Sequence, residues 1–433
     1  MIVLKRPPPG VPVSRGPSST REVRPLGRPL NIAILTQYYA PEVGAAQIRL
    51  AALAEAFTAR GHQVTVLTAM PNYPLGRIYA GYPRLLLRER VAGVRVIRTY
   101  IFPTQRANLL HRLASYVSFA GSSALVGTFL LPRPDYLLVQ SPPLVLGLTG
   151  VYLSWVKRTR MVFNVSDLYP ETAIRLGVLR AGTVLHRLSA WLEGFCYRHA
   201  WLVAGQTLET IRDIEARFPG CHTRLLSNGV DPSLLRPPSP AGGSSGLATR
   251  NGRCVAMYAG LHGLAQGLRH LLDAAEQLQG HPGCDLLLVG DGPEKSALVS
   301  DTNRRGLTNV RFLDPRPHSE MGRTLLQADI LIVPLVRYIP GAVPSKLYEA
   351  MATGRPVVLM AEGEAARVVQ EHQAGLLVAP GDAAGLAKAL RRLADDPALR
   401  ERLGRNGRAA VERHFDRRRI GAEFVQYLES VSP

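Results

Sequence analysis

Cysteine, aromatic side chains and acidic side chains are all scarce in this chain of 433 residues. Aromatic residues make up 6% of it, and 33 aspartates and glutamates stand against 52 lysines and arginines. No two of the four cysteines have C-x-x-C spacing; they are Cys196, Cys221, Cys254 and Cys284. This pattern argues against a structural zinc site and a disulfide framework, and it fits a reducing cytosol.

The charge balance is strongly basic, with a net charge of +19. Such an excess favours an anionic partner: a nucleic acid, an anionic lipid surface or a phosphorylated substrate. A genome rich in G and C would also raise the arginine content without a functional cause. Because the sequence contains no RNA- or DNA-binding motif and few aromatic residues, we expect no nucleic-acid partner.

Length and composition indicate a globular protein of two or three domains of about 150 residues each. Hydrophobic residues make up 46% and charged residues 20%, which are ordinary values. Residues 1–29 differ, because they combine six lysines and arginines with many prolines and have no apolar run of a signal peptide. We expect this segment to be a disordered extension.

Short apolar runs alternate with helical patterns along the rest of the chain. Residues 30–36 and 64–69 are typical of buried parallel strands, and residues 46–60 between them have one apolar helical face. The alternation resumes after residues 236–252, a Pro-, Gly- and Ser-rich segment typical of a linker or surface loop. We therefore predict an α/β fold with two Rossmann-like domains that face each other across a cleft.

Residues 113–131 have no charged side chain over 19 positions, which just reaches the length of a membrane-spanning helix. Four serines make the segment less apolar, and it lies between two predicted strands. We expect a helix that is buried or lies at an interface, rather than one that crosses a bilayer.

Two loops in the first half follow predicted strands, where parallel α/β sheets bind their ligands. In one loop, Gly44 and Ala45 come before a helix whose N-terminus offers free N–H groups to an anion. In the other, Asp167 follows a buried strand, where its carboxylate can accept a hydrogen bond from a substrate hydroxyl. An ordinary βα loop and a helix N-cap would explain these residues about as well.

A glycine-rich turn follows the first predicted strand of the second half. It covers residues 260–267 and includes Gly263 and Gln266, and it resembles a phosphate-binding turn in outline. It matches neither G-x-G-x-x-G nor a Walker loop. His262 can donate a hydrogen bond to a phosphate there, but a single loop histidine is more often a surface residue. A tight turn is enough to explain residues 290–294.

The most informative stretch is PSKLYEAMATGRP, residues 344–356. Ser345 and Lys346 stand at a predicted helix N-terminus, where the helix dipole, free N–H groups and an ammonium group converge on one anion. Glu349 lies one turn further on, where its carboxylate can bind the vicinal hydroxyls of a ribose. The alternative is a capped amphipathic helix with solvated lysine and glutamate side chains.

Taken together and in order, these segments resemble glycosyltransferase family 4, the retaining enzymes with the GT-B fold. The resemblance runs from about residue 30 to residue 430. PNYP, DLYPE and PSKLYE resemble the subgroup that adds sugars in O-antigen, colanic-acid and other exopolysaccharide assembly. Each motif is weak alone, and the ordered set carries the resemblance: residues 38–76, 166–179, 227–231, 263–268, 289–294 and 344–358.

The resemblance implies a GT-B fold with three parts after the extension. We expect an N-terminal acceptor-side domain over residues 30–205, a C-terminal sugar-nucleotide-binding domain over 206–415, and a helix over 416–433 that crosses back. Donor-binding roles fall on Gly44, Ala45, Gly263, Gln266, Ser345, Lys346 and Glu349. Catalytic roles fall on Asp167, Lys346 and Glu349. Ser345 and Lys346 would face the diphosphate, Glu349 the ribose, and Asp167 the acceptor.

The sequence also departs from the family pattern. The first position of the E-x7-E element falls on Gly341, and the turn GLHGLAQG lacks the usual Arg and Lys. Ser141-Pro142-Pro143 stands where many members have a histidine. Lys346 must then supply more of the positive charge at the pyrophosphate.

The resemblance further implies a nucleotide-sugar co-substrate, UDP-linked, with no metal and no other cofactor, and a lipid-linked saccharide acceptor. We expect a cytoplasmic protein with peripheral contact on the anionic inner leaflet, through residues 113–131 and the excess of Lys and Arg. Two alternatives stay open: a GT-B sugar-nucleotide epimerase, and a non-enzymatic protein that binds anions or nucleic acid.

Overall fold

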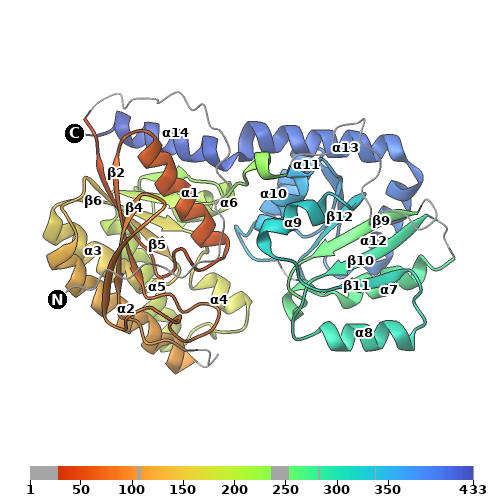
Figure 1. Ribbon diagram of the computed structural model, residues 1–433, viewed down its shortest axis with the longest axis horizontal. Coiled ribbons are helices and arrows are strands. Elements are labelled where there is room, and N and C mark those ends of the chain that lie inside the picture. Colours follow the sequence, from red (N-terminus) through yellow and green to blue (C-terminus); the bar gives the residue numbers. More distant parts are fainter. Residues whose placement is uncertain (1–27, 105–108, 236–252, 281–282, 337, 433) are drawn as a thin grey trace.

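The computed structural model describes residues 28–104, 109–235, 253–280, 283–336 and 338–432. Residues 1–27 of the predicted extension and the predicted linker 236–252 lie outside these ranges. The described chain forms two α/β domains side by side, and the C-terminal helices run along one edge of both (Figure 1). This is the predicted GT-B arrangement, in which a cleft separates two Rossmann-like domains.

An eight-stranded sheet forms the centre of the first domain, in the order β3-β4-β2-β1-β5-β6-β7-β8. All neighbouring strands are parallel except β3 and β4. Ile32 of β1 pairs with Val64 of β2 and with Tyr136 of β5. The strands are β1 (Asn31–Leu35), β2 (Gln63–Ala69), β3 (Leu86–Val91), β4 (Val94–Thr99), β5 (Tyr136–Ser141), β6 (Arg160–Val165), β7 (Leu202–Gly205) and β8 (Thr223–Leu225).

Helices cover both faces of this sheet, because alternate strand residues point to opposite faces. Ile32 and Ile34 pack in one core with α1 and with the last helix of the chain, α14 (Arg417–Ser430), whereas Ala33 and Leu35 pack in the other with α2, α3 and α5. The helices of the first domain are α1 (Ala45–Ala59), α2 (Leu109–Leu130), α3 (Leu146–Lys157), α4 (Glu171–Arg175), α5 (Val184–His199) and α6 (Leu208–Arg217).

The predicted boundary between residues 205 and 206 is too early. Helix α6 returns the chain to the first sheet, where β8 pairs with β7 at Val203 and Thr223. The first domain therefore includes β8, which ends at Leu225. The predicted boundary fell at the end of an apolar run, and the three-residue strand β8 has no such run to reveal it.

The second domain has a six-stranded, all-parallel sheet in the order β11-β10-β9-β12-β13-β14. Its strands are β9 (Cys254–Ala259), β10 (Cys284–Val289), β11 (Val310–Leu313), β12 (Ile330–Pro334), β13 (Val357–Met360) and β14 (Gly375–Val378). Its helices, with the short turns η1 to η3, are η1 (Pro232–Leu234), η2 (Leu264–Gln266), α7 (Arg269–Gln277), α8 (Lys295–Arg304), α9 (His318–Leu325), α10 (Ser345–Ala352), α11 (Glu364–Glu371), α12 (Ala383–Asp395), α13 (Pro397–Ala410) and η3 (Val411–Phe415).

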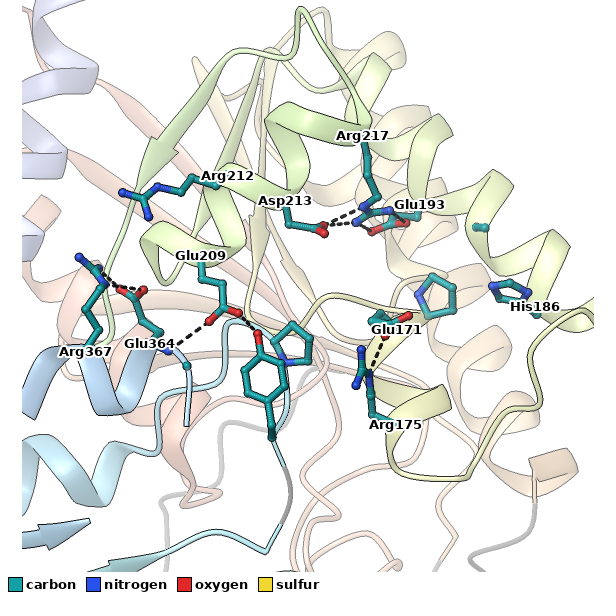
Figure 2. Close-up of a pocket in the computed structure, with 15 residues that line it drawn as sticks. Glu171, Arg175, His186, Glu193, Glu209, Arg212, Asp213, Arg217, Glu364 and Arg367 are labelled. Atoms are coloured by element: carbon teal, nitrogen blue, oxygen red, sulfur yellow. Dashed lines mark hydrogen bonds and ion pairs between the residues drawn. The ribbon is translucent and has the colours of Figure 1, made fainter. Parts of the chain in front are cut away.

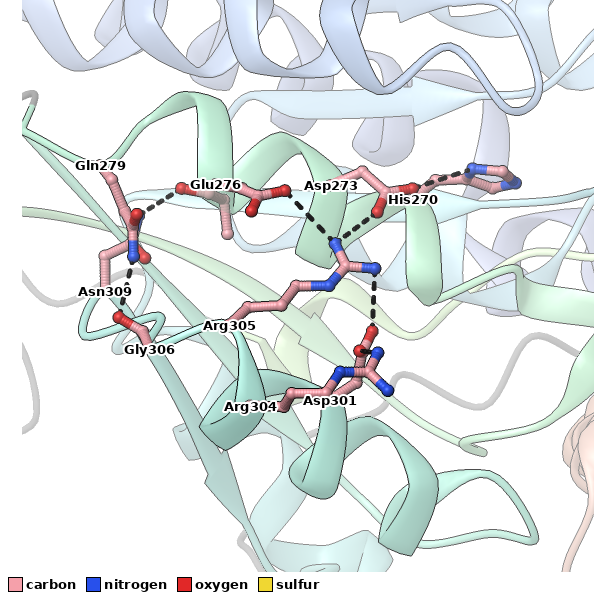
Figure 3. Close-up of polar contacts among 10 residues, drawn as sticks. His270, Asp273, Glu276, Gln279, Asp301, Arg304, Arg305, Gly306 and Asn309 are labelled. Carbon is pink, nitrogen blue, oxygen red and sulfur yellow. Dashed lines mark hydrogen bonds and ion pairs between the residues drawn. The ribbon is translucent and has the colours of Figure 1, made fainter.

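A network of charged side chains joins α7 to the end of α8 on the surface of the second domain (Figure 3). Arg305 is its centre, with Nη1 at 2.7 Å from Asp273 and 3.5 Å from Glu276, and Nη2 at 2.9 Å from Asp301. These contacts hold the two helices together at their solvent-facing ends.

The last helix, α14 (Arg417–Ser430), returns to the first domain and packs along α1 (Figure 1). The carboxylate of Glu429 accepts a hydrogen bond from Arg60 Nε at 3.0 Å and lies 3.0 Å from His62 Nε2. The hydroxyl of Tyr136 donates a hydrogen bond to Leu428 O at 3.1 Å. The C-terminus of the chain thereby ties the second domain to the first.

Candidate functional site

The residues predicted to form a site lie at the carboxyl ends of the two sheets, as parallel topology requires. Ser345, Lys346 and Glu349 begin α10, and Gly263 and Gln266 lie in the turn after β9. In the first domain, Gly44 and Ala45 begin α1 and Asp167 follows β6. Each group thus lies at the carboxyl edge of its own sheet, with Lys346 beside Tyr258 and Gly260 of the second domain.

Lys346 of α10 reaches across to β9. Its Nζ donates a hydrogen bond to the hydroxyl of Tyr258 at 3.1 Å and lies 4.8 Å from the centre of that ring. Within the described ranges it has no carboxylate at ion-pair distance. Burial lowers the pKa of Lys346, and the negative charge of Glu349 opposes that change. A partly desolvated ammonium group without a carboxylate partner favours an anionic ligand.

The N-terminus of α10 adds to this positive potential. Pro344 is the N-cap and supplies no side-chain hydrogen bond to the first turn. Its carbonyl oxygen accepts from Leu347 N at 2.9 Å, so the N–H groups of Ser345 and Lys346 are the ones that can meet a ligand. Glu349, one turn into the helix, also acts on a second cation, since its charge opposes the burial that lowers the pKa of Arg417. Arg417 stands at the start of α14, between the two domains.

The turn after β9 packs backbone to backbone against the turn after β10. Gly290 has φ +143, and a Cβ on it would lie 1.9 Å from the carbonyl oxygen of Gly260. His262 N donates to Asp291 O at 2.8 Å, and Glu294 N donates to His262 O at 3.0 Å. Residues 290–294 form a tight turn, as predicted, and through these backbone hydrogen bonds they also hold the turn after β9 in place.

His262 is not the surface residue that its loop position suggested. Its side chain is completely buried between Tyr258 and Phe312, and neither ring nitrogen has a partner among the described residues. Burial, followed by the charge of Lys295, lowers its pKa. With no exposed surface, His262 supports the turn from inside and does not meet a phosphate in this conformation.

Gly263 and Gln266 bound the short turn η2. Gly263 has an extended backbone at φ −125, and Gln266 N donates to its carbonyl oxygen at 3.2 Å. Gln266 Oε1 is buried without a partner in the described part of the chain. Gly267, at φ +58, needs glycine's freedom to end the turn.

Gly44 does not use the conformational freedom of glycine. Its φ of −175 is extended, and an added Cβ would meet only the flexible side chain of Gln47. No side chain caps α1, so the N–H groups that follow Gly44 and Ala45 stay open to a ligand. The close approach of a phosphate at Gly44 remains a prediction.

Arg49, which the sequence analysis missed, acts on Asp167 through its charge. Its buried guanidinium donates from Nη2 to Gln140 at 2.8 Å and to Ser166 at 2.9 Å. Burial raises the pKa of Asp167, and the charge of Arg49 opposes the rise; burial lowers the pKa of Arg49 itself to about 10. The sequence signal that could have revealed this role is the position of Arg49, next to Ile48 on the otherwise apolar face of the predicted helix.

Glu42 was also missed. Its side chain is 3% exposed; Oε1 accepts from the backbone N–H groups of Asn72 and Tyr73, both at 2.8 Å, and Oε2 accepts from Tyr39 N at 3.2 Å. One carboxylate therefore joins the loop after β1 to the PNYP loop. The sequence signal for this role was a glutamate in the middle of the loop after β1, a loop that we had considered only as a ligand-binding turn.

The position of Gly341 explains the departure from E-x7-E. Gly341 has φ +71, and a Cβ on it would lie 2.2 Å from the hydroxyl of Thr210 in α6. Thr207 also donates to the carbonyl oxygen of Gly341 at 3.1 Å. A glutamate cannot occupy this position without separating the two domains here.

A cavity of about 880 Å³ lies beside this contact, between α4, α5 and α6 of the first domain and residues 338–340 and 363–367 of the second (Figure 2). Glu209 bridges the domains, since it accepts from the hydroxyl of Tyr338 and from Glu364 N at 3.2 Å. None of the predicted site residues lines this cavity. Residues of both domains line it, and Pro340, the neighbour of Gly341, is one of them.

Among the described residues, no group of three or more His, Cys, Asp and Glu side chains could hold a metal ion. Transfer without a metal stays a prediction.

Family models match both halves of the chain. Residues 44–229 match the glycosyl transferase 4-like domain, and residues 247–410 match the glycosyl transferases group 1. The first match continues past β8, in agreement with the longer first domain.

Curated relatives are glycosyltransferases. The probable glycosyltransferase WbjE of Pseudomonas aeruginosa is 25% identical over 59% of this chain, and the match covers 65% of WbjE. A glycogen synthase of Mycobacterium tuberculosis is 31% identical over 55% of this chain and 59% of its own length. The chain thus spans less than two thirds of these relatives. The putative colanic acid biosynthesis glycosyl transferase WcaI of Escherichia coli is 24% identical over 75% of this chain and 81% of WcaI.

Solved structures share the fold. Sucrose-phosphate synthase from Thermosynechococcus elongatus superposes with a TM-score of 0.72 at 21% identity, over 93% of this chain and 99% of that one. Anabaena HepE in complex with UDP gives 0.68 at 20% identity, over 93% and 100%. At these identities the likeness establishes the architecture of both domains and nothing finer.

Proposed function

The chain belongs to the GT-B glycosyltransferases of the GT4 type, and we propose that it moves a sugar from a UDP-linked donor to a lipid-linked or oligosaccharide acceptor in bacterial surface polysaccharide assembly. WcaI, named for colanic acid biosynthesis, and LpsD, named for lipopolysaccharide core biosynthesis, support the pathway class. HepE, solved with UDP, supports the donor class.

Lys346 carries the proposal. A partly buried ammonium group held over Tyr258 at a helix N-terminus, with no carboxylate partner in the described ranges, suits a diphosphate better than it suits an internal ion pair. In our proposal Ser345 and the first N–H groups of α10 bind the same diphosphate, with Gly263 and Gln266 beside it. Glu349 binds the ribose hydroxyls, and α1 closes on the donor from Gly44 and Ala45.

In the proposed reaction, the bond between the anomeric carbon and the diphosphate oxygen breaks as the acceptor oxygen bonds to the same face of that carbon. The acceptor proton passes to the departing phosphate oxygen. Negative charge grows on the diphosphate, and Lys346 and the N–H groups of α10 stabilise it in a water-poor cleft. Asp167 orients the acceptor hydroxyl, and domain closure brings the two halves together.

The test starts with thermal stabilisation of the protein by a panel of UDP-, GDP- and ADP-sugars, followed by transfer to lipid-linked acceptors and product analysis, including anomeric configuration. Lys346→Ala and Glu349→Ala are expected to lose most turnover while staying folded. Lys388→Ala, an exposed lysine of α12, is the matched control and keeps full activity. Full activity in both site variants would contradict the assigned donor site.

The same panel without an acceptor distinguishes the epimerase alternative. Conversion of a UDP-sugar to its epimer in the absence of acceptor would replace the transferase proposal. A UDP-sugar that stays unchanged without acceptor and is consumed only when an acceptor is added supports the transferase proposal.

A further inference from the structure

Helix α2 has a packed inner face and an exposed apolar outer face. Ser115, Phe119 and Ser123, one turn apart, are buried, and an added Cβ on Gly127 would meet Leu153 and Leu67. On the opposite face the exposed fractions of the side chains are Leu110 76%, Val117 58%, Leu125 64% and Phe129 75%. In a globular protein that face is normally polar.

The neighbouring helices extend the exposed apolar surface. Thr128 Oγ1 of α2 donates to the hydroxyl of Tyr152 at 3.1 Å, so the outer stripe of α3 lies beside that of α2. Figure 1 shows α3 at the far left of the first domain, with α2 below it. We call this surface the apolar face; its exposed members on α3 and α5 are Leu148, Tyr152, Trp155, Val184, Leu188 and Trp191.

The charged side chains of α2, α3 and α5 are cationic except Glu193 of α5, which is buried and pairs with Arg217. Helices α2 and α3 contain no aspartate or glutamate. Arg112 is exposed near the start of α2, and Lys157, which donates to Thr128 O at 2.7 Å, lies by its end with exposed Arg158. Exposed Arg187 and Arg198 belong to α5. The result is an apolar surface with cationic edges and with tryptophan and tyrosine among its members.

We propose that the apolar face lies on the surface of an anionic lipid bilayer. Apolar residues flanked by cations, with Trp155 and Trp191 at the level of the headgroups, are typical of interfacial binding. α2 is the one helix among the described residues long and apolar enough to cross a membrane, but its inner face is part of the domain core. A second copy of the chain would bring the same cations into opposition.

A bilayer on the apolar face would also lie close to the loop after β1, at the carboxyl edge of the first sheet. Tyr38 stands in the loop after β1. Burial raises its pKa, Tyr116 of α2 raises it further, and Arg112 of α2 opposes the rise. His111, in the first turn of α2, lines a groove together with the loop after β2. This groove has a volume of about 690 Å³ and is formed by residues 75–77, 102–104 and His111. A lipid-linked acceptor could keep its lipid in the bilayer while its saccharide enters the cleft; this orientation rests on the proposed function.

The test is sedimentation of the full chain with vesicles of phosphatidylglycerol and phosphatidylethanolamine, compared with phosphatidylcholine vesicles. The double variant Leu125→Glu, Phe129→Glu keeps good helix formers and should lower affinity for anionic vesicles at least ~10-fold. Leu234→Glu, at a site 74% exposed on the second domain, is the matched control and should bind as wild type does. Equal binding by all three proteins, or no binding by wild type, would overturn the proposal.

Two further measurements separate this inference from the proposed function. Transfer to a short-chain acceptor in free solution should be the same in the double variant and wild type, whereas transfer to acceptor in vesicles should fall with binding. If the protein binds vesicles but has no transferase activity, the proposed docking surface is supported and the proposed function is rejected. A wild-type dimer that the double variant abolishes, without vesicle binding, would assign the face to a second copy and overturn the proposal.

Discussion

The Nζ atom of Lys346 occupies the place where a side chain on Gly260 would begin: a Cβ on Gly260 would lie 1.7 Å from it. Gly260 also has φ +148, which side chains rarely adopt. The glycine makes room for the ammonium group at the end of β9, so the two residues depend on each other although 86 positions separate them (346 − 260 = 86).

Gly260→Ala should therefore act through Lys346. We expect turnover to fall by about 10²-fold, the usual effect of losing one stabilising donor, because the ammonium group is displaced. Steady-state kinetics with a thermal unfolding control measure this.

The double variant Gly260→Ala, Lys346→Ala gives the decisive comparison. If both changes remove the same interaction, the double variant is hardly worse than Lys346→Ala alone. Additive losses would show that Gly260 acts independently of the lysine.

Asp167 predicts a pH dependence. Burial raises the pKa of its carboxyl, so kcat/KM should fall as the pH drops through this raised value and the carboxylate is protonated. Arg49 opposes the rise, so Arg49→Met should move the acid limb to higher pH, whereas Arg49→Lys, which keeps the charge, should move it less. If the acid limb of the pH profile is unchanged in Arg49→Met, the limb does not report the protonation of Asp167.

Asp167→Asn should be less active and more heat-stable at pH 7. A carboxyl whose pKa is higher in the folded than in the unfolded chain destabilises the fold once the pH exceeds its unfolded value, and asparagine removes that effect. The melting temperature measured at pH 7 checks it, and the difference should disappear below pH ~4, near the ordinary pKa of an aspartate.

Glu42→Ala should destabilise the first domain by about 1–3 kcal/mol, because it leaves three backbone N–H groups without their acceptor. Urea denaturation measures the change. The control is Glu55→Ala, an exposed position on α1, where we expect a change within about 0.5 kcal/mol. Equal effects would show that water replaces the Glu42 carboxylate at no cost.

Arg305 and Arg304 form a matched pair of neighbours. Arg305 contacts three carboxylates, whereas the side chain of Arg304 is 76% exposed and, among the residues that the structure describes, pairs with Asp301 alone. We expect Arg305→Ala to cost about 1 kcal/mol and Arg304→Ala clearly less, with the difference shrinking at high salt. A difference that persists in 1 M salt would assign the effect to packing.

The sequence indicated the two α/β halves because their strands are continuous apolar runs and their helices have one apolar face, both of which are local patterns. It also placed Ser345, Lys346 and Glu349 at the start of one helix, since a short motif contains all three, and the structure has them on α10. It could not find β8, whose three residues have no pattern of their own, nor the burial of His262, which depends on contacts with Phe312 and the turn after β10.

The amino-acid order by itself determined which segments become strands and helices, and which loops end at the carboxyl edge of a sheet, because these follow from periodicity over a few residues. Only the tertiary structure decided that the charge of Arg49 acts on Asp167, that Gly341 must be small against Thr210, and that the outer stripe of α2 faces solvent. Each of these depends on which surfaces pack together across long stretches of chain, and packing leaves no periodic signal in the sequence.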